Sequence, residues 1–112
     1  MTNLRYLGLG ALALAAATIG AIGGAEAKKA RCFTTDDGYF SCNFTATDKA
    51  GSFEIGAAGY PSYQLQVDQP GFAFGYINLG NRWISLPGQY VRSNDDGACW
   101  NNPETSTRIC AW

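Results

Sequence analysis

Apolar and polar side chains alternate along most of the chain after residue 28, which is the pattern of half-buried β-strands. The clearest run covers residues 62–68 and places three apolar side chains on one face: Tyr63, Leu65 and Val67. A second run, residues 39–46, brings together Phe40, Cys42 and Phe44. Because no window in this part of the chain shows a convincing apolar period of 3.6 residues, we predict an all-β protein.

The glycines at positions 38, 51, 59, 71, 80, 88 and 97 lie 8 to 13 residues apart, which is the turn spacing of β-sandwiches and small barrels. Gln69-Pro70-Gly71 is one such turn, since proline presets φ and glycine accepts the positive φ that follows. Further strands are predicted at residues 53–55, 72–79, 82–86, 89–93, 98–101 and 107–112. We expect one domain of about six to eight antiparallel strands, folded as a small disulfide-stapled sandwich or partly closed barrel.

The predicted strand at residues 72–79 is unusual because it carries apolar side chains on both faces. One face holds Phe72, Phe74 and Tyr76, and the other holds Ala73, Gly75, Ile77 and Leu79. Such a strand is either central in the fold or leaves an aromatic stripe exposed. A large uncovered apolar surface usually marks an interaction site.

The first 27 residues have the order of a secretory signal peptide. Arg5 precedes a leucine- and alanine-rich run over residues 7–17, and the segment ends in Ala25-Glu26-Ala27, a small-x-small cleavage site. We therefore predict a signal peptide at residues 1–27 and a mature domain at residues 28–112. The mature protein is expected in the periplasm or outside the cell, with membrane contact only through the signal peptide during export.

An uncleaved membrane anchor is the alternative, because residues 7–25 are 19 uncharged positions in a row. The leucines stop at Leu14, however, and a basic flank follows the segment: Lys28, Lys29 and Arg31. The positive-inside rule would place that flank in the cytoplasm and leave the cysteines in a reducing space. These two observations favour cleavage.

Four cysteines in an exported domain predict two disulfides. Nine residues separate Cys32 from Cys42, and ten separate Cys99 from Cys110. Each pair brackets a turn-rich segment, so the simplest arrangement is two hairpins with one disulfide across each. Joining Cys32 to Cys110 is the alternative, and chain entropy alone does not exclude it. A zinc site is not expected, since it requires closely spaced ligands and the chain has no histidine.

The remaining residue types argue against catalysis. Without histidine, Ser–His–Asp and Cys–His mechanisms are excluded. A pair of carboxylates could still hydrolyse a glycoside, and the candidates are Asp36, Asp37, Glu54, Asp68, Asp95, Asp96 and Glu104. Asp36-Asp37-Gly38 and Asp95-Asp96-Gly97 are typical of β-turns, however, and neither has the alternating ligands of a calcium loop. We predict no enzymatic activity, no metal and no cofactor.

Charge and aromatic content point to a binding role. Residues 28–112 hold seven basic and eight acidic side chains, a balance that does not suit nucleic acid. Three tryptophans are either core residues, as in other β domains, or a recognition platform together with nearby tyrosines. We name Tyr76, Trp83 and Trp100 as candidate ligand-binding residues. The expected function is a monomeric exported binding module for an envelope protein or glycan. A structural or stress-related envelope protein, or a carboxylate glycoside hydrolase, is the alternative.

Two resemblances bear on these expectations. Residues 31–38, together with the closing pattern that includes Ala98-Cys99-Trp100 and Ile109-Cys110-Ala111-Trp112, resemble small exported two-disulfide bacterial proteins of unassigned function. That resemblance implies export but no activity. More remotely, Tyr39-Phe40-Ser41-Cys42 is similar to the early Tyr-x-Cys element of the small β-barrel inhibitors of C-type lysozyme. Their inhibitory Ser-Gly-x-x-Tyr loop has no match in this chain, so no inhibitory residue is carried over.

Overall fold

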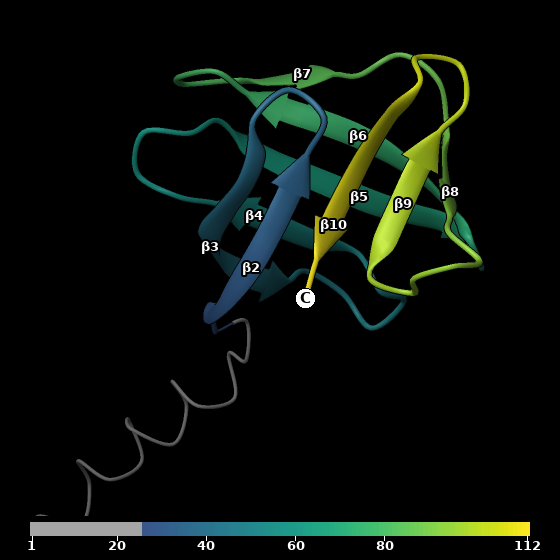
Figure 1. Ribbon diagram of the computed structural model, residues 1–112, viewed down its shortest axis with the longest axis horizontal. Helices are drawn as coiled ribbons and strands as arrows, with labels where there is room; N and C mark the ends of the chain where they lie inside the picture. The colour runs from purple at the N-terminus through teal and green to yellow at the C-terminus, as the bar shows by residue number, and fades with distance from the viewer. Residues whose placement is uncertain (1–25) are drawn as a thin grey trace, which may run out of the picture.

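The computed structural model describes residues 26–112, and these form nine antiparallel β-strands and no helix (Figure 1). Residues 1–25, which make up nearly all of the predicted signal peptide, lie outside the described residues. The strands are β2 (Lys28–Thr34), β3 (Gly38–Ala46), β4 (Phe53–Gly56), β5 (Ser62–Gln69), β6 (Phe72–Asn78), β7 (Trp83–Ser85), β8 (Tyr90–Arg92), β9 (Cys99–Asn102) and β10 (Thr107–Ala111). In this part of the chain, no helix has the length and apolarity needed to span a bilayer.

The strands close into a barrel, which decides between the two predicted architectures. Neighbouring strands follow the order β5-β4-β3-β2-β10-β9-β8-β6, and β5 pairs with β6 to complete an eight-stranded ring. β7 is an additional strand that pairs with β6 through residues 83–85. β6 reaches β8 only through Phe72 and Ala73. The predicted all-β, antiparallel, disulfide-stapled fold is confirmed, and it is the barrel rather than the sandwich.

The described strands number one more than the upper end of the expected six to eight, because β2 was not among the strands assigned from alternation. Its inward positions are Ala30, Cys32 and Thr34, which are small or polar, so the strand shows little apolar periodicity. β2 pairs with both β3 and β10, so the first and the last described strands lie side by side in the barrel wall. The backbone N–H of Trp112 donates to the Arg31 carbonyl at 2.9 Å and extends this pairing to the last residue.

The core fills the inside of the barrel with inward residues from its eight strands, and β7 contributes none. Its buried members are Cys32, Phe40, Cys42, Phe53, Ile55, Tyr63, Leu65, Ala73, Tyr90, Trp100 and Ile109. The predicted inner faces of residues 39–46 and 62–68 are confirmed, since Phe40, Tyr63 and Leu65 are all buried. Gly75 is required on β6 because a Cβ there would lie 2.6 Å from Cε1 of Tyr90.

Both predicted local disulfides are present, Cys32–Cys42 and Cys99–Cys110. Cys32 and Cys42 belong to the core inside the barrel. Cys110 lies opposite both Cys99 and the outward-facing Phe33 in the strand register, so the second disulfide is on the outward side of the wall, where its two cysteines are each only 1% exposed. Two disulfides in a small domain are typical of proteins that fold in an oxidising compartment.

Candidate functional site

Four aromatic side chains share the outward face of β6 and β7 and are here named the β6–β7 stripe: Phe72, Phe74, Tyr76 and Trp83. Phe72 and Phe74 are 38% and 42% exposed, Tyr76 is half-buried, and Trp83 is 37% exposed. Alternation along β6 puts its three rings on the outside. Trp83 lies opposite Asn78, which shares that face, so its ring is on the same side as Tyr76.

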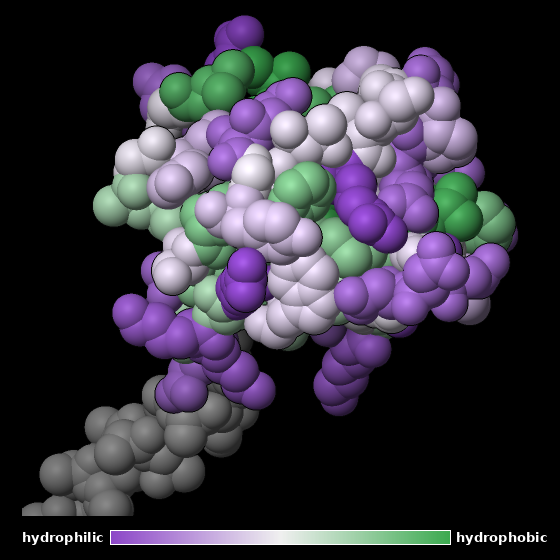
Figure 2. Space-filling model, in the orientation of Figure 1, coloured by the Kyte–Doolittle hydropathy of each residue, from purple (hydrophilic) through white to green (hydrophobic). Residues whose placement is uncertain are grey.

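This arrangement settles the two possibilities for residues 72–79. The small residues Ala73 and Gly75 point into the barrel, and the large rings point outward. The strand therefore carries an exposed aromatic stripe, the second of the two predicted arrangements. Figure 2 shows the strongest hydrophobic colour at the top of the molecule, over the β6–β7 hairpin, where Leu79 and Ile84 are also exposed.

Amide side chains of β5 border the stripe on one side. Gln64 lies opposite Tyr76 in the register, and Gln66 lies opposite Phe74. The Gln66 side chain donates to Gln64 at 3.3 Å, and Gln64 donates in turn to Glu54 at 3.2 Å. Each amide offers two N–H groups and one acceptor oxygen, so this row keeps hydrogen-bonding capacity next to the rings.

Trp100 is not part of this surface, so its expected position at a recognition face is wrong. Its ring is 2% exposed and belongs to the core, opposite Ile109 of β10. The guanidinium carbon of Arg92 lies 4.7 Å from the ring centroid and covers the ring at the barrel end. Of the three named candidates, the structure brings together Tyr76 and Trp83 and separates Trp100 from them.

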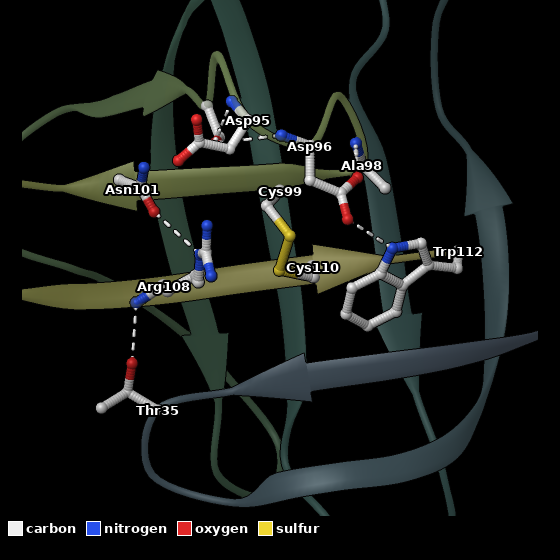
Figure 3. The surroundings of a disulfide bond; sticks show 10 residues. Thr35, Asp95, Asp96, Ala98, Cys99, Asn101, Arg108, Cys110 and Trp112 are labelled. Atoms are coloured by element: carbon white, nitrogen blue, oxygen red, sulfur yellow. Dashed lines mark hydrogen bonds between the residues drawn. A yellow bond between two sulfur atoms is a disulfide. The ribbon is translucent and has the colours of Figure 1, made fainter.

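The third tryptophan, Trp112, lies on the outer surface beside the Cys99–Cys110 disulfide (Figure 3). Its indole Nε1–H donates to Oδ2 of Asp96 at 2.8 Å, and its ring stacks on Tyr39 with centroids 6.0 Å apart. In Figure 1 the C-terminus is at the bottom and β7 is at the top, so Trp112 is remote from the stripe. Two exposed tryptophans thus occupy different parts of the barrel surface.

The outer surface of β9 supplies polar groups near the other end of the stripe. Val91 of β8 pairs with both Phe72 and Asn101 and so lies between them. Asn101 accepts a hydrogen bond from Nε of Arg108 at 3.0 Å (Figure 3). Asp95 is exposed in the loop between β8 and β9.

The two Asp-Asp-Gly segments both form turns, but they do so differently. Gly38 has φ 76°, as expected for a turn glycine. Gly97 is not among the glycines with positive φ in the described residues, so the second segment does not form the turn with a positive-φ glycine that its sequence suggests. There, Ser93 Oγ accepts from the N–H of Asp95 at 3.1 Å, and Asp96 accepts from the N–H of Ala98 at 2.9 Å.

The candidate carboxylates for hydrolysis do not gather at one place. Asp37 lies in the β2–β3 turn, at the top in Figure 1, and Asp96 lies in the β8–β9 loop at the bottom. Both carboxylates accept structural hydrogen bonds, Asp37 from Thr34 and Asp96 from Trp112. Within residues 26–112, no group of three or more His, Cys, Asp or Glu side chains is arranged to hold a metal ion.

A second candidate site, which the sequence reasoning missed, is a cavity of about 210 Å³ at one end of the barrel. The residues that line it are Thr34, Thr35, Asp36, Tyr63, Ile77, Leu86, Pro87, Tyr90, Thr105, Thr107, Arg108 and Ile109. Burial raises the pKa of Tyr63 above its ordinary value of 10.0, and its hydrogen bond to Asp37 raises that pKa further. In the sequence, the only sign of this site was a tyrosine at an inward strand position, since the hydroxyl of such a residue needs a polar partner.

The pairing of Asp96 with Trp112 predicts a pH-dependent contact. The N–H of Ala98 and the indole of Trp112 lower the pKa of Asp96 below its ordinary value of 3.8. A lowered pKa in the folded state adds stability above pH 3.8, and this is lost as the pH falls through the lowered pKa. In an NMR titration we expect the Trp112 indole N–H signal to shift with a midpoint below pH 3.8. Asp96→Asn should abolish that shift, and a midpoint at or above 3.8 would contradict the assignment.

Comparison of the chain with protein-family models, with curated proteins and with solved structures found no match.

Proposed function

We propose that this protein is an exported, non-catalytic binding module that recognises a glycan of the cell envelope through the β6–β7 stripe. The observation that carries the proposal is that β6 places its large side chains outside the barrel and its small ones inside. Phe72 and Phe74 point to solvent while Ala73 and Gly75 point inward. Burying a large aromatic side chain stabilises a small domain substantially, so rings placed outside leave that gain unused. A recognition role accounts for their placement.

The neighbours of the rings favour a glycan as the ligand. A sugar ring has an apolar C–H face that packs on an aromatic ring, and its hydroxyl groups need both donors and acceptors. Gln64 and Gln66 offer both beside Tyr76 and Phe74. The four stripe residues are themselves uncharged, which suits a neutral ligand surface. A protein partner would use the same rings, since aromatic residues are also enriched at protein interfaces.

Export and the absence of catalysis belong to the same proposal. The predicted signal peptide at residues 1–27 and the two disulfides both support a periplasmic or extracellular location. The structural hydrogen bonds of Asp37 and Asp96 favour a turn role for these carboxylates. The alternative, a structural envelope protein without a ligand, would draw its support from the buried aromatics Trp100 and Tyr90.

Trp83→Ala should weaken glycan binding about tenfold, because it removes a stacking ring that contributes little to the core. A stacked ring is worth on the order of 1–3 kcal/mol in nucleobase recognition, and tenfold corresponds to about 1.4 kcal/mol. The measurement is co-sedimentation with purified peptidoglycan, together with titration of soluble chitooligosaccharides. Trp112→Ala is the matched control, since it removes an exposed tryptophan remote from the stripe.

The control variant should bind as the wild type does, and both variants should keep a thermal midpoint within a few degrees of it. Phe74→Ala should reproduce the loss of binding. Equal losses in the Trp83 and Trp112 variants would remove the stripe from the proposal. A wild-type protein that binds neither glycan would overturn the glycan assignment, and capture of an envelope protein through the same rings would replace it.

A further inference from the structure

The mouth cavity, defined by the lining residues given above, lies where three connections gather at one end of the barrel. Figure 1 shows them at the top: the β2–β3 turn, the link between β7 and β8, and the β9–β10 turn. An eight-stranded barrel has an interior just wide enough to be filled by side chains or to hold one small ligand. In this barrel, side chains fill one end of the interior, and the other end has space for a small ligand.

Side-chain size along the barrel axis explains the empty end. The Trp100 ring fills the interior away from the mouth, where Arg92 covers it, and Tyr63 and Tyr90 are the two rings that reach the cavity. Toward the mouth, the inward positions of β2, β6 and β10 hold smaller side chains: Thr34, Ile77 and Ile109. The wall is also interrupted here, because β6 pairs with β8 only through Phe72 and Ala73, and Leu86 and Pro87 of the β7–β8 link line the cavity instead. A space therefore remains and opens to solvent.

A partly buried polar network lies at the wall of this cavity. The hydroxyl of Tyr63 donates to Oδ2 of Asp37 at 2.8 Å, and Oγ1 of Thr34 donates to the same oxygen at 2.7 Å. A hydroxyl can both donate and accept, so the Tyr63 oxygen keeps acceptor capacity after this bond. Tyr63 as a whole residue is only 5% exposed, and its hydroxyl oxygen lies in a partly buried hydrogen bond at the edge of the cavity.

The charges around the mouth favour a cationic ligand group. Asp36 lines the cavity, and Asp37 lies behind the Tyr63 hydroxyl. Arg108 is the one basic residue among the residues that line the cavity. Its guanidinium keeps its charge while Nε donates to Asn101, so the two aspartates and Arg108 together leave a net charge of −1 around the mouth. Hydrogen bonds between an ionised donor and a carboxylate are roughly twice as strong as neutral ones.

We propose that the mouth cavity binds a small single-ring molecule that carries a protonated amine, with the ring against Ile77 and Ile109 and the ammonium group at Tyr63 and Asp36. The size follows from the volume, since a cavity of roughly 150 Å³ already holds benzene and drug-sized ligands need about 300 Å³ or more. This site is inside the barrel and the β6–β7 stripe is outside, so the two proposals fail or succeed separately.

The test is an NMR titration of the isotope-labelled wild-type protein with three probes of one shape: benzylamine, benzyl alcohol and benzoate. Benzylamine should shift the backbone signals of the cavity lining, above all those of Tyr63, Ile77 and Ile109. Benzoate should bind at least tenfold more weakly than benzylamine, because its carboxylate meets Asp36 and Asp37. The absence of shifts in the lining with all three probes at millimolar concentration would overturn the site. Benzoate binding equal to benzylamine would overturn the ligand class.

Two aspartates in exposed turns provide a matched pair of charge variants. Asp36→Asn should lower the affinity for benzylamine at least fivefold and leave that for benzyl alcohol unchanged. Asp95→Asn, at the opposite end of the barrel, should change neither. Equal effects of the two variants would contradict the proposed ammonium position. Thr107→Trp should fill the mouth and abolish all three titrations, and its fold is checked by the unchanged signals of β3 and β4.

Discussion

Trp100→Ala should lower the free energy of unfolding by about 3–5 kcal/mol, the usual cost of truncating a large buried aromatic residue. The Trp100 side chain is among the largest fully buried groups, and it contacts the core at the centre of β9. In a domain of this size, a loss of 1 kcal/mol lowers the thermal midpoint by roughly 4–8 °C. The expected fall is therefore well over 10 °C, measured by circular dichroism and by guanidinium unfolding.

Trp83→Ala is the control for this result, because it removes the same side chain from the outer surface. Its ring is already 37% exposed, so its cost should be about 1 kcal/mol or less. The stability of Trp100→Phe should lie between those of Trp100→Ala and Trp83→Ala, since phenylalanine keeps part of the buried area. Equal stability of the two alanine variants would contradict the placement of Trp100 inside the barrel.

Removing either disulfide should destabilise the domain by about 3 kcal/mol, since each closes a loop of similar length. The sequence separations are 10 for Cys32–Cys42 and 11 for Cys99–Cys110, so loop entropy alone does not distinguish the two pairs. Burial does not distinguish them either, because all four cysteines are at most 3% exposed. Replacing either pair by alanine therefore leaves buried space, at about 1 kcal/mol for each methyl-sized void.

The comparison therefore uses two double variants, Cys32→Ala/Cys42→Ala and Cys99→Ala/Cys110→Ala, under guanidinium denaturation. The two double variants should therefore lower the free energy of unfolding by the same amount within about 1 kcal/mol. A clearly larger loss from Cys99→Ala/Cys110→Ala would show that Trp112 and its neighbours depend on that disulfide more than the core depends on Cys32–Cys42. Non-reduced mass mapping of the wild type confirms that each pair is oxidised before the comparison is made.

Several elements followed from sequence alone because their causes are local. Alternation over residues 39–46 and 62–68 predicted which side chains share a face, and the barrel buries Phe40 and Tyr63 on those faces. The close spacing within each cysteine pair predicted both disulfides, because a hairpin brings such neighbours together. The turn at Gly71 followed from proline and glycine chemistry and has φ 85°.

The candidate site was predictable only in part, because alternation does not say which face of a strand is inside. Tyr76 and Trp83 are on one outer surface as proposed, and Trp100 is not. β9 is four residues long, and its first two are both buried, one on each side of the wall. So short an element shows no period that could have separated a core tryptophan from a surface one.

By itself, the sequence determined that this protein is a β-rich, two-disulfide domain with an apolar strand at residues 72–79. These properties depend on neighbours a few residues apart along the chain. The tertiary structure decided that the sheet closes as a barrel, because closure rests on distant pairings such as Thr34 with Ile109. Closure in turn assigned inside and outside to every strand. It buried Trp100, exposed the β6–β7 stripe, and left the mouth cavity where small inward residues meet an interrupted wall.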